Sequence, residues 1–196
     1  TQHAGSSLHV HMSFRDPRGG AVFAESGAAR SGAPAGASED FRFAVGGLLA
    51  RARELSLLFA PNVNSYKRYV EGTFAPTRIA WSRDNRTVGF RVVGHGPGLR
   101  IECRIPGADA NPYLVYAGLI AAALDGIARR SEPGPLFEGD GYRAKDLPRV
   151  PGSLAEAIGE FERSAFVREA LGDAVVEHLL HFARAELRSA ERAVTD

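Results

Sequence analysis

The run from Pro112 to Arg129 constrains the fold more than any other segment, because it is apolar on nearly every side. Asn111 suits an N-cap and Pro112 suits the first helical position, so the run predicts a helix. Its most apolar stretch, Tyr113 to Leu124, is shorter than the ~20 residues that a membrane-spanning helix needs. We therefore expect the central buried helix of a soluble protein that has no membrane partner.

Composition narrows the class of protein further. A length of 196 residues suits one ordinary globular domain. The formal net charge of +1 argues against nucleic acid as a partner, since neutralising phosphates needs a clear basic excess. The one cysteine, Cys103, excludes an intrachain disulfide framework and a cysteine-based zinc site. These features predict a cytoplasmic protein.

The charges are segregated along the chain. Residues 61–105 hold eight basic and three acidic side chains, whereas residues 153–196 hold nine acidic side chains and five arginines. This separation indicates a cationic working surface and an acidic, solvated helical surface. The alternative is that the arginines lie on strand edges and block aggregation there.

Periodicity and turn residues give the expected elements. Strict alternation from Ser7 to Phe14 predicts a strand. A turn at 16–20 and a second strand at 21–24 could complete a hairpin. Residues 26–38, rich in Gly, Ala and Ser, predict a mobile loop, and 131–152 a long loop. Further strands are expected at 78–82, 87–93 and 99–105, and helices from near Ser38 to Pro61, from Ser153 and from Asp173.

His9 and His11 are two residues apart on the first expected strand, so their imidazoles share one face. A neutral imidazole is a common metal ligand and otherwise can donate a hydrogen bond to phosphate. A His-x-His pair on a strand is more often structural or exposed, and this pattern alone leaves both roles open.

Arg100, Glu102 and Arg104 form a second cluster on one face of the strand at 99–105. They could form a solvent-facing ladder of salt bridges, which would add little stability. Alternatively, the carboxylate ligates a hard cation while the guanidinium groups bind a carboxylate or phosphate. Glu102 and His9 together would be tolerable but insufficient ligands for Mg²⁺ or Mn²⁺.

Arg86 and Arg91 are the core of a third cluster. Several convergent arginines suit phosphoryl transfer, which needs positive charge around the moving group. On a regular strand the two side chains would face opposite ways, unless a bulge at Gly89 intervenes. The sequence contains no Walker loop, no GxGxxG and no GxSxG, which argues against P-loop, Rossmann and hydrolase functions.

Five motifs occur in the order and approximate spacing of the glutamine synthetase family. They are GSSLHVHMS at 5–13, NSYKR at 64–68, NRT at 85–87, RIECR at 100–104 and DANPY at 109–113. The resemblance implies an α+β fold, with a curved, mostly antiparallel sheet backed by helices. It also implies that residues 1–196 are the C-terminal part of the catalytic domain, without the N-terminal β-grasp domain and the upstream strands that carry further metal ligands.

The resemblance also implies roles for individual positions. Two positions match metal ligands, one for each of two Mg²⁺ or Mn²⁺ ions: His9 and Glu102. Four match positions at ATP, the arginines lying at the phosphates and Arg86 beside the γ-phosphate: His11, Ser13, Arg86 and Arg91. Three match the binding site for the glutamate substrate: Gly5, Arg68 and Arg104.

The activity implied by the resemblance is an ATP-dependent ligation. ATP phosphorylates the γ-carboxylate of glutamate, and an amine nitrogen then displaces phosphate to give the amide. Family members assemble into ring-shaped homo-oligomers with sites between neighbouring subunits, so self-association is expected. With one ligand for each metal, the 196-residue chain alone is expected to be inactive.

Departures from the family pattern concern the amine. Phe74 replaces the glutamate that binds ammonium and removes its proton, and its local sequence resembles the γ-glutamyl-polyamine and γ-glutamyl-ethanolamide synthetases. We therefore favour a polyamine or an ethanolamine-like amine over ammonia. Ala4 replaces an asparagine that touches substrate, and Lys145 is expected at the position of the tyrosine that bacterial enzymes adenylylate. The alternatives are an ordinary glutamine synthetase that uses ammonia, and a non-catalytic, oligomer-forming or ligand-sensing relative.

Overall fold

The computed structural model describes residues 6–24, 34 and 36–193. The expected loop at 26–38 lies largely outside the described residues. The elements in chain order are β1 (Val10–Met12), α1 (Glu39–Arg51), α2 (Ser56–Phe59), η1 (Val63–Arg68), β2 (Trp81–Arg83), β3 (Phe90–Val93), η2 (Gly96–Gly98), β4 (Arg100–Cys103), α3 (Pro112–Arg129), η3 (Gly141–Arg143), α4 (Leu154–Arg163), α5 (Ala165–Leu171) and α6 (Asp173–Arg192).

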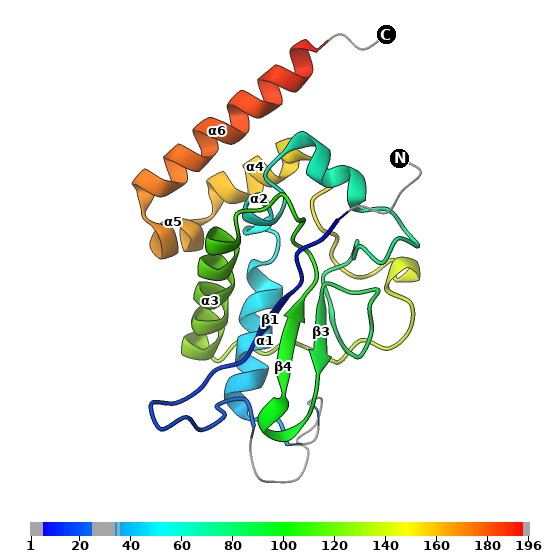
Figure 1. Ribbon diagram of the computed structural model, residues 1–196, viewed down its shortest axis with the longest axis vertical. Helices are drawn as coiled ribbons and strands as arrows, with labels where there is room; N and C mark the ends of the chain where they lie inside the picture. Colours follow the sequence, from blue (N-terminus) through cyan, green and yellow to red (C-terminus); the bar gives the residue numbers. More distant parts are fainter. Residues whose placement is uncertain (1–5, 25–33, 35, 194–196) are drawn as a thin grey trace.

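The described strands form one sheet with the order β1-β4-β3-β2. The pairs β1–β4 and β4–β3 are antiparallel, and β2–β3 is parallel. Helices α1 and α3 run side by side, and α6 extends along one end of the molecule (Figure 1). The expectation of an α+β protein with a mostly antiparallel sheet is confirmed.

The strands are shorter than the alternation predicts. Around β1, the stretch from Ser7 to Phe14 continues only as the isolated bridges Ser7–Gly107 and Arg15–Ala21. The second of these bridges belongs to the expected turn, where the backbone N–H of Asp16 donates to the carbonyl of Gly20. Side-chain alternation extends beyond the residues that make ladder hydrogen bonds, so it overestimates strand length.

The helix expected from Ser38 to Pro61 begins correctly but is interrupted. Ser38 caps α1 by accepting a hydrogen bond from the backbone N–H of Phe41 at 3.0 Å. After Arg51 the backbone tightens, and the backbone N–H of Ser56 donates to the carbonyl of Arg53, three residues earlier instead of four. The apolar periodicity continues through this turn, which is why the sequence gives no sign of the interruption.

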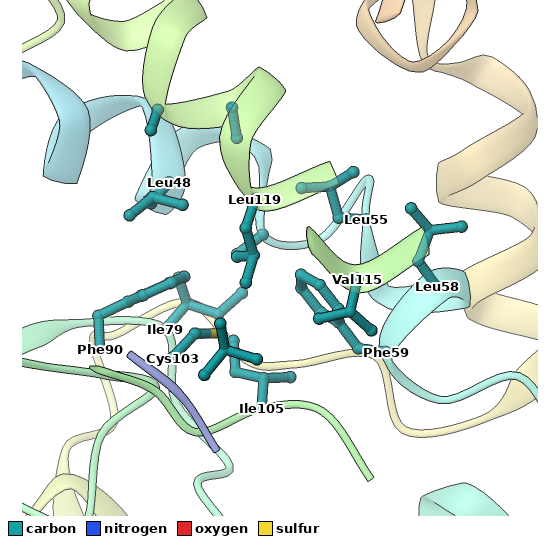
Figure 2. Packing of buried hydrophobic residues seen from close by; sticks show 14 of the residues in the cluster. Leu48, Leu55, Leu58, Phe59, Ile79, Phe90, Cys103, Ile105, Val115 and Leu119 are labelled. Carbon is teal, nitrogen blue, oxygen red and sulfur yellow. The ribbon is translucent and has the colours of Figure 1, made fainter. Parts of the chain in front are cut away.

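The core lies between the helices and one face of the sheet. Figure 2 shows Leu48 of α1 and Leu119 of α3 directed toward Phe90 and Cys103 of the strands. Ile101, Cys103 and Ile105 are each no more than 2% exposed, as the alternation in β4 predicts. Consequently the residues between them are directed to the opposite face of the sheet.

Glycines allow α1 and α3 to pack backbone against backbone. A Cβ atom on Gly126 would lie 2.2 Å from the carbonyl oxygen of Phe43 and 2.6 Å from the nitrogen of Gly47. A Cβ on Gly47 would lie 2.1 Å from the carbonyl oxygen of Ala122. No larger residue fits at either position without separating the helices.

The helix at 112–129, expected to be the central buried helix, is buried on one side only. Val115, Leu119 and Ala122 of α3 are buried, but the opposite side carries an exposed apolar stripe formed by Tyr113, Tyr116, Ile120 and Leu124. The buried side of α3 packs against α1 and the core, while Tyr116 and Ile120 of the stripe border a hollow beside β1. Among the described residues, no helix is long and apolar enough to cross a membrane.

The C-terminal helices follow the sequence expectation with one addition. The expected capping box opens α4, where Ser153 accepts from the backbone N–H of Glu156 at 3.2 Å. Leu180 and Ala183 of α6 are buried, as its periodicity predicts. The short helix α5 was not expected, since seven residues give too little periodicity to read.

We predict that Gly126→Ala lowers the free energy of unfolding by about 3 kcal/mol, because its methyl group overlaps the backbone of α1. Equilibrium unfolding in urea measures this change. The matched control is Gly159→Ala in α4, where the nearest atoms belong to the flexible side chain of Arg163 and the change should be neutral or stabilising. Equal stability of the two variants would contradict the close packing of α1 and α3.

A second prediction concerns pH. The Glu156 carboxylate accepts from the backbone N–H of Gly152 at 2.9 Å and pairs with Arg53, and these contacts lower the pKa of Glu156. Its stabilising effect is therefore present above the unfolded-state pKa and is lost as the pH falls through the lower folded-state pKa.

Because Glu156 is partly exposed, Glu156→Gln should cost about 0.5 kcal/mol at pH 7. The difference from the unaltered protein should shrink below about pH 4, measured by urea unfolding across a pH series. Glu191→Gln, on the exposed end of α6, serves as the control and should have no effect at either pH. A Glu156→Gln cost that does not depend on pH would contradict this assignment.

Candidate active site

The polar face of the sheet is centred on a buried carboxylate. Glu102 of β4 is 3% exposed, and both of its oxygens accept hydrogen bonds from arginines. Arg104 donates to Oε1 at 2.9 Å, and Arg91 of β3 donates to Oε2 at 3.0 Å. Arg104 is itself 3% exposed. The hypothesis of a solvent-facing ladder is therefore wrong for Glu102 and Arg104.

The two histidines of the N-terminal strand meet the same carboxylate. His9 Nδ1 lies 3.2 Å from Glu102 Oε1, and His11 Nε2 lies 3.7 Å from that oxygen. The register of β1 and β4 places His11 opposite Glu102, and the shared face of alternate residues brings His9 to the same side. Two segments more than ninety residues apart in sequence thus converge on one carboxylate.

The environment fixes the charges of this cluster. Burial and the charge of Arg104 lower the pKa of His9, so its imidazole is neutral at neutral pH. Burial alone would raise the pKa of Glu102, but the hydrogen bond from Arg91 and the charge of Arg104 hold that pKa below its usual value. The result is an ionised carboxylate beside a neutral imidazole, both of which can donate electron pairs.

A cavity of about 510 Å³ opens beside these histidines. It lies between β1 and α3, and its lining includes His9, His11 and Ser13 together with Tyr116 and Ile120. Ser13 is exposed there. The three polar residues that the family resemblance predicts at metal and nucleotide therefore border one hollow, together with Val10, Met12 and Phe14 of the same segment.

The donor set of the described residues is incomplete for a divalent cation. No group of three or more His, Cys, Asp or Glu side chains that could hold a metal ion occurs within residues 6–24, 34 and 36–193. His9 and Glu102 have suitable chemistry, but the carboxylate oxygens are already paired with Arg91 and Arg104. Mg²⁺ prefers six oxygen ligands in octahedral geometry, so a complete site needs further carboxylates.

Phe74 lies next to the cluster through its backbone. Its side chain is 63% exposed, and its φ of 58° is in the left-handed region, which a bulky residue rarely adopts. Its carbonyl oxygen accepts a hydrogen bond from Arg104 at 3.3 Å. One guanidinium group therefore contacts both Glu102 and the backbone of Phe74.

Arg86 is not brought into this cluster by a direct contact. It is exposed in the loop between β2 and β3, four residues before the first residue of β3, so strand alternation does not govern its direction. The loop is held by Asn85, whose side-chain oxygen accepts from the backbone N–H and the hydroxyl of Thr87 at 2.9 and 2.7 Å. Of the two arginines predicted at phosphate, only Arg91 contacts Glu102.

Arg68 lies near the same end of β4. It donates to the carbonyl of Ile105, and its guanidinium group stacks on the ring of Tyr69 at 5.0 Å from the centroid. The positive charge of Arg68 also contributes to lowering the pKa of His9. Gly5 and Ala4 lie outside the described residues, and Lys145 is exposed.

Three contacts at the site were not predicted. Asp84 pairs with Arg91 at 3.0 Å, Arg100 donates to His11 Nδ1 at 3.2 Å, and Tyr142 donates to the carbonyl of Ala75 at 3.1 Å. The shared strand face of Arg100 and Glu102 could have indicated the second contact. Tyr142 lies in the predicted long loop at 131–152, where no periodicity marks it.

The chain matches the glutamine synthetase catalytic domain over residues 1–196. It is 47% identical over 192 residues to γ-glutamylethanolamide synthetase from Streptomyces coelicolor, a match that covers 98% of this chain and 40% of that protein. It is 38% identical over 178 residues to a glutamine synthetase from Thermococcus kodakarensis, covering 87% of this chain and 38% of that protein.

A solved structure of a GmaS–ADP complex resembles the fold, with a TM-score of 0.86 and 31% sequence identity over 98% of this chain and 44% of that one. The chain therefore spans about two fifths of the length of the curated relatives it matches. The matched domain covers every residue of the sequence, including the Glu102 cluster. The chain belongs to the glutamine synthetase family.

Proposed function

We propose that the protein is an ATP-dependent ligase that joins glutamate to an amine through a γ-glutamyl phosphate. The observation that carries the proposal is the convergence of His9, Glu102, Arg91 and Arg104, in a chain of the glutamine synthetase family. Arginines around a developing anion stabilise charge in phosphoryl and acyl transfer.

The arginines divide between the phosphates and the amino acid in this proposal. Arg91 and Arg86 bind the phosphates of ATP, and Arg86 acts beside the γ-phosphate. The exposure of Arg86 supports this role, because its guanidinium group is open to a ligand. Arg68 and Arg104, with Gly5, bind glutamate. The guanidinium groups of both arginines lie at the same end of β4, where Arg68 donates to the carbonyl of Ile105 and Arg104 donates to Glu102.

In this proposal the nucleotide and the metal ions bind beside the histidines of the β1 segment. His11 and Ser13 border the cavity beside β1, and a structural neighbour is a complex with ADP. His9 would supply one ligand to one Mg²⁺ or Mn²⁺ ion and Glu102 one ligand to a second ion, and such ions would neutralise phosphate charge. The remaining ligands would come from outside the residues that the structure describes.

The amine is the finer part of the proposal. Phe74 cannot accept a proton, but its exposed ring offers an apolar face that attracts a cation weakly. This favours an alkylamine, either a polyamine or an ethanolamine-like compound. The identity of 47% with a γ-glutamylethanolamide synthetase supports the same choice. The chain alone is proposed to be inactive, and assembly into a ring-like homo-oligomer stays a prediction from the family.

The first test supplies the full-length protein with glutamate, ATP, Mg²⁺ and one of three amines: ammonium, ethanolamine or putrescine. We expect phosphate release and a γ-glutamyl amide by mass spectrometry, with ethanolamine or putrescine preferred over ammonium. A preference for ammonium would indicate an ordinary glutamine synthetase. Nucleotide binding without product from any amine would indicate a non-catalytic relative.

The second test exchanges the residue that faces the amine. In the full-length protein, Phe74→Glu should lower kcat/KM for the preferred alkylamine about tenfold, because the apolar contact is lost. It should also raise turnover with ammonium, since a carboxylate can accept its proton. Val70→Glu, at another exposed apolar residue of the same segment, should leave the preference unchanged. The idea fails if Phe74→Glu and Val70→Glu behave alike.

A further inference from the structure

The segment that carries Phe74 is fixed at two consecutive carbonyls. Arg104 donates to the carbonyl of Phe74 at 3.3 Å, and the hydroxyl of Tyr142 donates to the carbonyl of Ala75 at 3.1 Å. Arg104 reaches the segment from the buried floor of the site, whereas Tyr142 reaches it from η3, near the surface. Two hydrogen bonds on adjacent peptide groups fix the direction of the backbone between them.

Tyr142 is itself held in place. The carboxylate of Asp140 accepts from the backbone N–H of Tyr142 at 3.0 Å, which caps η3. The backbone N–H of Gly141 donates to the hydroxyl oxygen of Thr87 at 2.7 Å. A Cβ atom on Gly141 would lie 2.6 Å from the carbonyl oxygen of Thr87, so η3 contacts the loop between β2 and β3 backbone to backbone.

This loop is the one that carries Arg86. Asn85 donates to the carbonyl of Gly139 at 2.8 Å, which adds a second hydrogen bond between the loop and the segment before η3. Tyr142 therefore connects the loop of Arg86 to the segment of Phe74. The phenol is half-buried, and burial raises its pKa, so the hydroxyl remains a proton donor throughout the neutral range.

We propose that Tyr142 is a positioning residue for amine selection: it holds the Ala75 carbonyl so that the Phe74 ring faces the amine. The ends of the segment are held separately, by hydrogen bonds from Thr73 to the carbonyl of Val70 and from Val150 to the carbonyl of Thr77. Between them, Tyr142 and Arg104 set the direction of the peptide groups that support the left-handed backbone of Phe74. The inference rests on the proposed ligase function and adds a determinant that does not touch the amine.

The test uses the full-length protein with the preferred alkylamine and with ammonium. Tyr142→Phe removes only the hydroxyl and should lower kcat/KM for the alkylamine about fivefold, as expected for one lost hydrogen bond. This loss should come from a higher KM for the alkylamine, while the KM values for glutamate and ATP stay unchanged. Tyr113→Phe, on a tyrosine of α3 that is 80% exposed, is the matched control and should change nothing.

A double-mutant cycle separates positioning from a general structural effect. If Tyr142 acts through the Phe74 ring, Tyr142→Phe should have no further effect on the ratio of alkylamine to ammonium turnover in a Phe74→Ala background. A shift in that background, or an equal loss with both amines in the single variant, would overturn the inference while leaving the ligase function intact. Failure of the unaltered protein to form any amide would overturn the ligase function itself.

Discussion

The polar face of the sheet depends on the pairing of the buried Glu102 carboxylate with the side chains around it. A buried carboxylate is costly unless it is paired, and here two arginines and two histidines surround it. Glu102 is opposite His11 in the β1–β4 register and opposite Arg91 in the β4–β3 register. A slip of one residue in either pairing would place Glu102 and its partner on opposite faces of the sheet, so the site assembles only in the correct register.

Much of the secondary structure could be predicted, because strand alternation and helix caps are patterns of only a few residues. Alternation in 99–105 identified both faces of β4, and Ser38, Asn111 and Ser153 identified three helix starts. The environment of α3 could not be predicted, because an apolar surface alone does not say on which sides other segments lie. The interruption after Arg51 was equally hidden, since a tightened turn keeps the same buried face.

The site was predictable where motifs and strand faces agreed. His9 and Glu102 were expected to converge, and they lie 3.2 Å apart. The position of Arg86 relative to the cluster was not predictable, because loops have no period that sets side-chain direction. Tyr142 was missed for a related reason: its contact joins positions 67 residues apart through a segment rich in proline and glycine.

The anchoring of residues 74 and 75 has an evolutionary consequence. Both hydrogen bonds end on main-chain oxygens, which every amino acid possesses. A mutation at codon 74 would therefore alter the chemistry presented to a nucleophile while the peptide stays where it is. Selection can therefore change the side chain at this position by single substitutions without rebuilding the sheet that holds it.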